Sequence, residues 1–161
     1  MQLRRATMAD LEALTAMEAM CFPPAEAASK TDFAKRLASY ADHFFLLFDE
    51  DGRLVSFIDG MATDDEHLTD EMYANASMHN PNGAWQMIFG LNTRPDCRRR
   101  GYAGIVLKAL IDDAKNSGRK GLVLTCKDHL VPYYSRFGFA DDGLSDSTHG
   151  NVAWHEMRLT F

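Results

Sequence analysis

Cysteine is scarce in this chain: Cys21, Cys97 and Cys126 are its only three, and they lie far apart in the sequence. An odd number of cysteines at such spacings forms neither a disulfide framework nor a zinc-binding pattern. We therefore expect free thiols in a reducing compartment, which favours a cytoplasmic location.

Long apolar runs and excess positive charge are also missing. No run approaches the length of a membrane span, and residues 1–5 lead into no apolar stretch of the kind found in signal peptides. Acidic residues outnumber basic ones by 23 to 17, so the net charge is −6. The sequence thus predicts neither a membrane nor a nucleic acid as partner. Because repeats and linkers are absent too, we expect one domain over residues 1–161.

Against this acidic background, one basic segment stands out between a predicted strand and a predicted helix. Residues 85–92 are an apolar run typical of a buried strand. From residue 103 to residue 114, apolar side chains recur at helical spacing, and Gly118 follows where a helix-ending glycine is expected. The segment between them contains three consecutive arginines and then Gly101.

This order of strand, basic turn and helix is typical of an anion site. The first N–H groups of a helix lack partners within the helix, and the helix dipole favours negative charge there. Gly101 allows the backbone to approach a ligand closely, and arginine side chains match phosphate oxygens in pairs. The alternative is a solvated basic turn, but three arginines at a helix start favour phosphate binding.

Two blocks of sequence carry a resemblance to a known family. Residues 98–103, Arg-Arg-Arg-Gly-Tyr-Ala, resemble the acyl-CoA signature Q/R-x-x-G-x-G/A of the GNAT superfamily of N-acetyltransferases. Residues 124–139, with the run Leu-Val-Pro-x-Tyr-x-Arg-Phe-Gly-Phe, resemble the region after the fifth strand of arylalkylamine N-acetyltransferases and their polyamine-acetylating relatives. The resemblance implies acetyl transfer from acetyl-CoA to a primary amine of a small molecule, by direct attack in a ternary complex and without a metal.

The resemblance also implies how the coenzyme is held. The main chain of the fourth strand would bond the pantetheine arm, an N–H at Leu91 or nearby would face the thioester oxygen, and the basic turn would hold the pyrophosphate. The coenzyme-binding residues implied in this way are Leu91, Asn92, Thr93, Arg98, Arg99, Arg100, Gly101, Tyr102, Ala103 and Gly104.

The general acid implied by the resemblance is Tyr134. A phenol with a pKa near 10 is a plausible proton donor to a departing thiolate. Tyr133 precedes it, but neighbouring helical residues point about 100° apart, so both cannot face the sulfur equally. One of the pair could simply be a core residue, and Tyr134 is favoured as the acid.

The general base is harder to place. Vertebrate arylalkylamine enzymes carry two histidines on the fourth strand, whereas Met87 and Phe89 stand at those places here and do not titrate. Glu26 lies in a Pro-Pro-x-Glu-x-x-Ser segment that resembles one near the acceptor amine in the polyamine-type and insect enzymes. We expect Glu26 to hold the ammonium or take its proton, with His79 as a second candidate. The alternative for Glu26 is a solvated loop carboxylate.

The remaining pattern completes the predicted fold. Residues 63–83 form an acidic insert, interpreted as a flap that attracts cationic amines. The group Asp64-Asp65-Glu66-His67 matches no metal motif, so a solvated face is favoured. We expect a mixed α/β fold whose mostly antiparallel sheet has about six to seven strands and helices on both faces. The predicted strands are 2–5, 43–48, 54–61, 85–92, 121–126, one that begins with residues 137–140, and 155–161. The predicted helices begin near residues 8, 31, 103 and 128. Thr7 is expected to cap the first of them and Asp128 the last, with Pro132 in the first turn of the last helix.

Three other functions compete with that of a small-molecule acetyltransferase. An enzyme acting on protein N-termini or lysines would share the coenzyme residues, but the insert would narrow its acceptor groove. A non-catalytic acetyl-CoA-binding module would not need Tyr134. A dinucleotide-binding fold is excluded because the turn lacks the G-x-G-x-x-G run. A monomer or a homodimer is expected.

Overall fold

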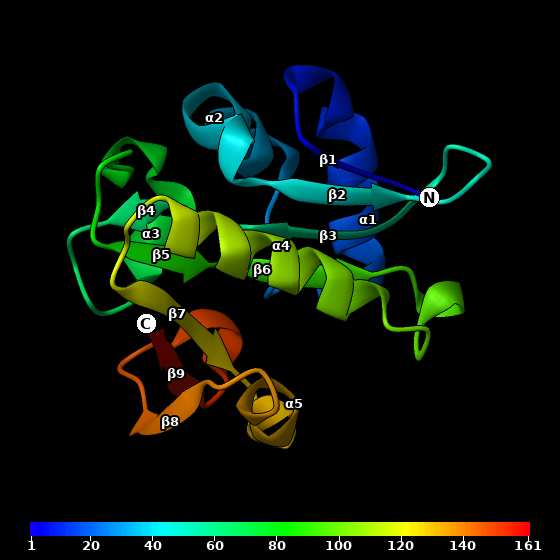
Figure 1. The fold of residues 1–161 in the computed structure, drawn as a ribbon. Helices are drawn as coiled ribbons and strands as arrows, with labels where there is room; N and C mark the ends of the chain where they lie inside the picture. The colour runs from blue at the N-terminus through cyan, green and yellow to red at the C-terminus, as the bar shows by residue number, and fades with distance from the viewer.

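A computed structural model describes all 161 residues, and the two chain ends lie on opposite sides of the molecule (Figure 1). The helices are α1 Leu11–Cys21, α2 Lys30–Tyr40, α3 Asp70–Ala74, α4 Tyr102–Asn116 and α5 Val131–Ser135. The strands are β1 Gln2–Arg5, β2 Phe45–Phe48, β3 Leu54–Asp59, β4 Ala62–Thr63, β5 Trp85–Ile88, β6 Gly90–Thr93, β7 Gly121–Cys126, β8 Ala140–Leu144 and β9 His155–Thr160. None of the helices has the length and apolarity needed to cross a lipid bilayer.

The strands form two sheets. Residues 85–93 contribute a strand to each of them. One sheet has the order β1-β2-β3-β6 and the other the order β4-β5-β7-β9-β8. The chain changes sheets at Phe89, because β5 pairs in parallel with β7 whereas β6 pairs antiparallel with β3. β6 and β7 are therefore not hydrogen-bonded to each other, and the end of β7 beyond Leu124 has no partner on the β5 side.

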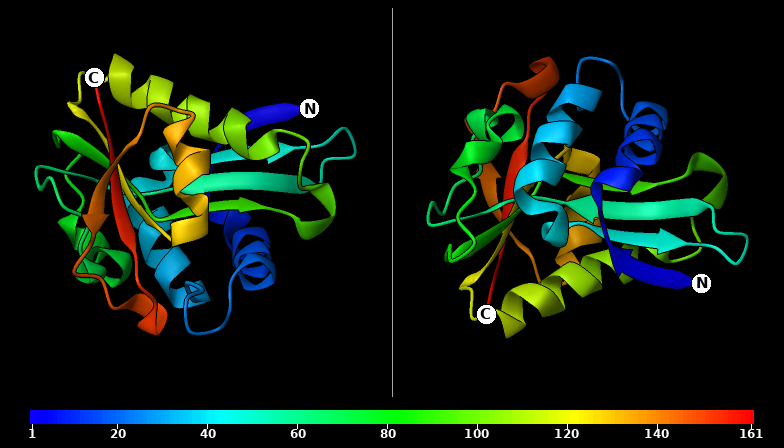
Figure 2. Two further views of the ribbon diagram at one scale, coloured as in Figure 1. Left: turned by 90° about the horizontal axis from the view of Figure 1, so that it is seen from below. Right: turned by 90° about the horizontal axis from the view of Figure 1, so that it is seen from above.

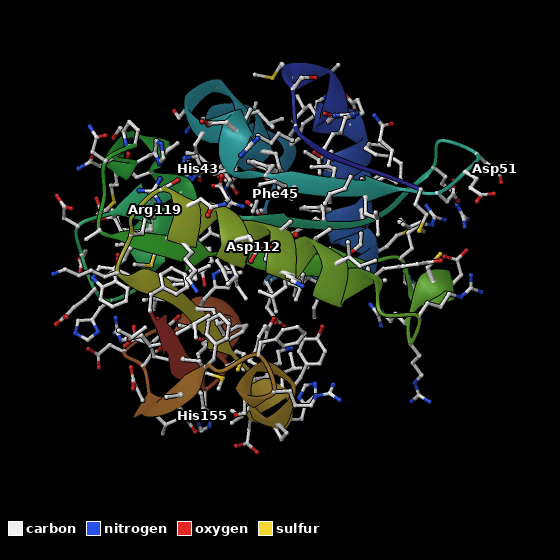
Figure 3. The ribbon with its side chains drawn as sticks, in the orientation of Figure 1. His43, Phe45, Asp51, Asp112, Arg119 and His155 are labelled. Atoms are coloured by element: carbon white, nitrogen blue, oxygen red, sulfur yellow. The ribbon has the colours of Figure 1, made fainter.

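Helices cover both faces of this arrangement, with α1 and α2 on one side and α4 on the other (Figure 2). Side chains alternate along β2, so that Leu46 joins the core under α1 and α2, while Phe45 and Leu47 join the core under α4. A strand buried on both faces reads as a continuous apolar run, which is why residues 43–48 lack polar alternation. Phe45 is seen beside α4 in Figure 3.

Several local signals are confirmed. The Thr7 N–H donates to Asp10 Oδ2 at 2.8 Å and the Ala9 N–H to Thr7 Oγ1 at 3.3 Å, which is a capping box. The first turn after Thr7 is a 3-10 helix, and α1 continues from it. Gly118 has a φ of +75° after the last residue of α4, as a helix-ending glycine requires.

The predicted mixed, mostly antiparallel α/β fold is confirmed, but its strands form a sheet of four and a sheet of five and not one sheet of about six to seven. Three local predictions also differ from the structure. The strand predicted at 85–92 is two strands, since the Phe89 N–H donates to the Asp59 carbonyl and turns the chain toward β3. β8 starts at Ala140, because Phe137 and Phe139 donate their N–H groups to the Tyr134 carbonyl and close the end of α5. Asp128 does not cap its helix; instead its Oδ1 lies 3.1 Å from Nε2 of His155, which Figure 3 shows near α5.

Candidate active site

A cleft of about 840 Å³ opens where β6 and β7 diverge. Leu91 and Thr93 line it from β6, and Leu124, Thr125 and Cys126 line it from β7. It extends from the start of α4 to the loop between α1 and α2. A cleft of this size is typical of a site for a small molecule or cofactor.

The basic turn forms one end of the cleft. Its lining residues there are Arg98, Arg99, Gly101, Tyr102 and Ala103. Gly101 is the N-cap of α4 with a φ of +81°, in the left-handed region that favours glycine. The free N–H groups of the first turn of α4 therefore come next to three exposed arginines, of which two line the cleft. This end has the chemistry of an anion site.

Tyr134 lines the middle of the cleft and is 8% exposed. Its ring packs edge-on against Tyr133 at 5.3 Å and against Phe139 at 5.9 Å between centroids. Burial raises the pKa of the Tyr134 phenol well above its ordinary value. The hydroxyl is thus protonated at neutral pH and available as a donor. Tyr133 also lines the cleft, so neither tyrosine is a plain core residue.

The other end of the cleft is aromatic. Tyr73 stacks on His149, with ring centroids 5.0 Å apart and an interplanar angle of 11°, and contacts Phe89 at 4.9 Å. Burial raises the pKa of the Tyr73 phenol to about 12, and its hydroxyl lies 3.1 Å from Thr125 Oγ1. Phe22 and Trp154 also line this end. The arrangement offers flat apolar surfaces to a ligand.

Glu26 lies at the same end and is not a solvated loop carboxylate. Its side chain is 6% exposed, and Lys127 Nζ lies 2.9 Å from Glu26 Oε1 and 3.2 Å from Oε2. His149 Nε2 lies 2.9 Å from the Glu26 carbonyl oxygen. A Cβ atom on Gly150 would stand 2.7 Å from Glu26 Cγ, so this turn packs tightly over Glu26. The carboxylate is enclosed and ion-paired.

Most of the predicted coenzyme residues meet in the cleft. Seven of the ten line it, namely Leu91, Thr93, Arg98, Arg99, Gly101, Tyr102 and Ala103. The other three do not: the Asn92 side chain is buried and donates to Glu18, Arg100 is exposed, and Gly104 packs near Phe137. Most of the predicted coenzyme-binding residues thus lie on one continuous surface, the wall of this cleft.

The residues considered for the base are separated. Glu26 lines the cleft, but His79 does not; it packs 4.6 Å from the His43 ring and 5.0 Å from the Tyr40 ring. Of the two positions that hold histidine in vertebrate arylalkylamine enzymes, Met87 is fully buried and Phe89 lines the cleft.

The acidic insert contributes to the lining of the cleft, but with other residues than the acidic group that was expected to do so. Asp70, Tyr73 and Ala74 line the cleft, whereas residues 64–66 do not. Asp64 Oδ1 instead accepts the N–H of Ala84 at 3.0 Å, which ties down the loop before β5.

Other lining residues were not singled out from the sequence: Glu18, Phe22, Arg36, Tyr73, Lys127, His149 and Trp154. They come from α1, α2, the insert, the end of β7 and the loop before β9. The tertiary fold brings these residues together from distant parts of the chain. No local sequence motif identifies them as site residues.

Comparison with known proteins agrees with this geometry. The model of the Acetyltransferase (GNAT) family matches residues 11–139. Serotonin N-acetyltransferase of Mesocricetus auratus is 32% identical over 112 residues, which are 69% of this chain and 53% of that protein. The chain thus spans about half the length of the curated relatives it matches.

Solved structures share the fold. The loading GNATL domain of CurA from Lyngbya majuscula has a TM-score of 0.84 at 15% identity, covering 99% of this chain and 96% of that one. The GphF GNAT-like decarboxylase in complex with isobutyryl-CoA has a TM-score of 0.78 at 19% identity, covering 99% of both chains. With most of its length matched by the family model, this chain belongs to the acetyltransferase (GNAT) family.

Proposed function

We propose that this chain transfers an acetyl group from acetyl-CoA to the primary amine of a small molecule, with residues 1–161 acting as one acyltransferase domain. The supporting observation is one continuous cleft that joins an anion site, a buried phenol and an aromatic end bearing a carboxylate. Each part corresponds to one part of the reaction. We further propose a cytoplasmic monomer or homodimer that needs neither metal, membrane nor nucleic acid.

The coenzyme would lie along the divergence of the two sheets. Its pyrophosphate would meet the N-terminus of α4 and the turn from Arg98 to Ala103, with Arg100 and Gly104 at the margin. Its pantetheine arm would follow the free edge of β6, bonding main-chain groups of Leu91 and Thr93. Asn92, predicted to do the same, turns its carbonyl toward β3, where it accepts from Ser56 Oγ at 2.6 Å. Thr93 supports this arrangement, because its carbonyl points away from β3 and accepts from Cys21 Sγ and Arg98 Nε, each at 3.4 Å.

The reaction then follows from the groups that the cleft presents. The neutral amine nitrogen attacks the thioester carbon, and the Leu91 N–H stabilises the oxygen that gains charge. The carbon–sulfur bond breaks, and the Tyr134 hydroxyl gives its proton to the departing thiolate. The nitrogen, now part of an amide, releases one proton, which returns the Tyr134 phenolate to the phenol through water. The proton is present on the Tyr134 phenol at neutral pH, because burial raises the pKa of this group above its ordinary value.

The acceptor end favours an arylalkylamine over a polyamine. Its aromatic side chains, Phe22, Tyr73, Phe89, His149 and Trp154, can pack against an aromatic ring. Glu26 would act on the ammonium, either holding it or taking its proton. Serotonin N-acetyltransferase, a relative by sequence, is named for an acceptor with an aromatic ring and a single amine.

A protein acceptor is less well supported. The loop before β9 crosses the acceptor end, where the Thr148 N–H donates to Asp70 Oδ2 at 3.1 Å and Ser147 Oγ bonds the same carboxylate. This contact ties the loop to α3, and we expect it to hinder an extended peptide at this end. A small amine needs no such groove.

The test is an amine panel with acetyl-CoA, following thiol release and the mass of the product. We expect phenethylamine and tryptamine to be acetylated faster than spermidine, and all of them faster than a peptide with a free N-terminus. Preference for the peptide would support the protein-acetylating alternative. Calorimetric binding of acetyl-CoA without thiol release from any amine would indicate a non-catalytic binding module.

A further inference from the structure

A second carboxylate, Glu18 on α1, lies against the divergence point and has no role so far. It is 5% exposed and lines the cleft. Its Oε1 accepts from Asn92 Nδ2 at 3.1 Å, and its Oε2 accepts from the Ala28 N–H at 2.9 Å. Both partners are neutral, so no cation is hydrogen-bonded to this carboxylate.

The nearby cation is committed elsewhere. Arg36 Nη1 donates to Asp59 Oδ2 at 3.0 Å, and its Nη2 donates to the Tyr73 carbonyl at 2.8 Å. Asp59 is fully buried and Arg36 is 3% exposed. The buried cluster of Glu18, Asp59 and Arg36 therefore contains two carboxylates and one guanidinium. A buried excess negative charge favours the uptake of a proton or the approach of a cation.

Polar atoms of this cluster converge over Gly90, the residue before Leu91. A Cβ atom on Gly90 would lie 3.2 Å from Asp59 Oδ1, 3.3 Å from Asn92 Nδ2 and 3.5 Å from Glu18 Oε1. Asp59 Oδ1 has no hydrogen-bond partner. The space that a side chain would fill at Gly90 is thus bounded by polar atoms, next to the N–H proposed to face the thioester.

The charged surroundings of Glu18 come from several elements. The titratable groups that influence Glu18 or the neighbouring Arg36 are Cys21 on α1, Asp32, Arg36 and Tyr40 on α2, and Asp59 on β3. Burial, followed by the charge of Asp59, raises the pKa of Glu18 to about 7. A carboxyl group with this pKa can exchange a proton at neutral pH.

We propose that Glu18 accepts the proton that the acceptor ammonium loses before attack. The N–H bond of the ammonium breaks, an O–H bond forms on the Glu18 carboxylate, and the freed lone pair of the amine attacks the thioester. The proton then passes to solvent before the next turnover. This proposal rests on the proposed function, and it leaves Glu26, which is paired with Lys127, to hold the ammonium.

The test is the pH dependence of kcat/KM for phenethylamine, with acetyl-CoA saturating, between pH 5.5 and 9.5. In wild type we expect a rising limb with a midpoint near pH 7. Glu18→Gln keeps the shape of the side chain, should lose that limb, and should lower kcat/KM at neutral pH by about 10²–10³-fold. Glu26→Gln is the matched control and should keep the limb while raising KM for the amine. Glu18→Asp should restore part of the activity.

Four outcomes decide the matter. A Glu18→Gln protein that binds acetyl-CoA as wild type does and keeps the wild-type pH profile would overturn the proposal. If wild type acetylates no amine, the proposed function fails, and carbon-13 NMR titration of the glutamate carboxyls still tests Glu18 itself. A Glu18 midpoint near 7, identified by its loss in Glu18→Gln or by its shift in Glu18→Asp, supports the proton site. A midpoint below 5 overturns it.

Discussion

The side chains of Lys127 and Glu26 form an ion pair inside the cleft, with Lys127 Nζ 2.9 Å from Glu26 Oε1. Lys127 follows the end of β7, whereas Glu26 lies in the loop between α1 and α2. The ammonium of Lys127 thus occupies a place that the ammonium of a substrate could take. The protein's own cation neutralises the carboxylate at the acceptor end.

This pair predicts that Lys127 lowers the affinity for cationic amines. In Lys127→Met the carboxylate of Glu26 loses its partner, so an amine substrate can pair with it. We expect KM for phenethylamine to fall roughly 3–10-fold, and a diamine to gain more than a monoamine. Lys120→Met removes an exposed lysine outside the cleft, so it should change neither the KM for phenethylamine nor the KM for the diamine. An unchanged KM in Lys127→Met would show that the amine does not reach Glu26.

Tyr134→Phe should keep the packing of the ring against Phe139 and remove the proposed proton donor. We expect kcat to fall by roughly 10²–10⁴-fold, with acetyl-CoA affinity little changed by calorimetry. Tyr133→Phe is the neighbouring control and should have a much smaller effect. Equal rates for Tyr134→Phe and wild type would mean that the thiolate departs without this proton, or that chemistry does not limit the rate.

Ala103→Asp should weaken acetyl-CoA binding strongly, since Ala103 lines the basic end of the cleft and a carboxylate there repels phosphate. Ile105→Asp places the same charge two residues further along α4, at an exposed position that does not line the cleft. We expect calorimetry to show a loss of at least about tenfold for the first variant and little change for the second. Wild-type affinity in folded Ala103→Asp would remove the pyrophosphate from this turn.

The buried environment of His79 predicts how the free energy of unfolding depends on pH. Burial, followed by the nearby His43, lowers the pKa of His79 to about 4, and its Nδ1 accepts the Ala62 N–H at 3.1 Å. The folded state therefore prefers neutral imidazole. Its contribution is complete above the ordinary pKa of 6.5 and is lost as the pH falls from 6.5 toward 4.

We expect denaturant unfolding to show about 1–2 kcal/mol lost over that interval because of His79, less than the full shift because the ring is half-exposed. His79→Asn retains an acceptor for Ala62 and should flatten this part of the pH profile. A profile identical to wild type would assign the loss to other groups.

Local chemistry made much of the fold predictable. Thr7, Gly118 and Pro132 each act through their immediate neighbours, and each has the predicted position at a helix end. The division of residues 85–92 was not predictable, because Phe89 leaves β5 only to bond with Asp59 on β3. A continuous apolar run gives no sign of a partner that lies elsewhere in the chain.

The candidate site shows the same division. Arg98, Gly101 and Ala103 form a local motif, so one end of the cleft could be predicted. The partners of Glu26 and Glu18 could not, since Lys127 is 101 residues from Glu26 and Asn92 is 74 residues from Glu18. Glu18 follows Met17 on α1 and reads as an ordinary polar residue of an amphipathic helix. Only the contact of α1 with β6 reveals that it is buried.

The unpaired edge of β6 has a consequence for aggregation. An exposed strand edge can recruit a strand from another molecule, and soluble proteins usually protect such edges. Here the edge faces inward across a cleft bounded by the N-terminus of α4 and by Tyr134 of α5. The groups of this edge that face the cleft can bond a slender ligand, whereas the walls of the cleft hinder the approach of a strand from a second polypeptide, so we expect this open edge not to promote aggregation.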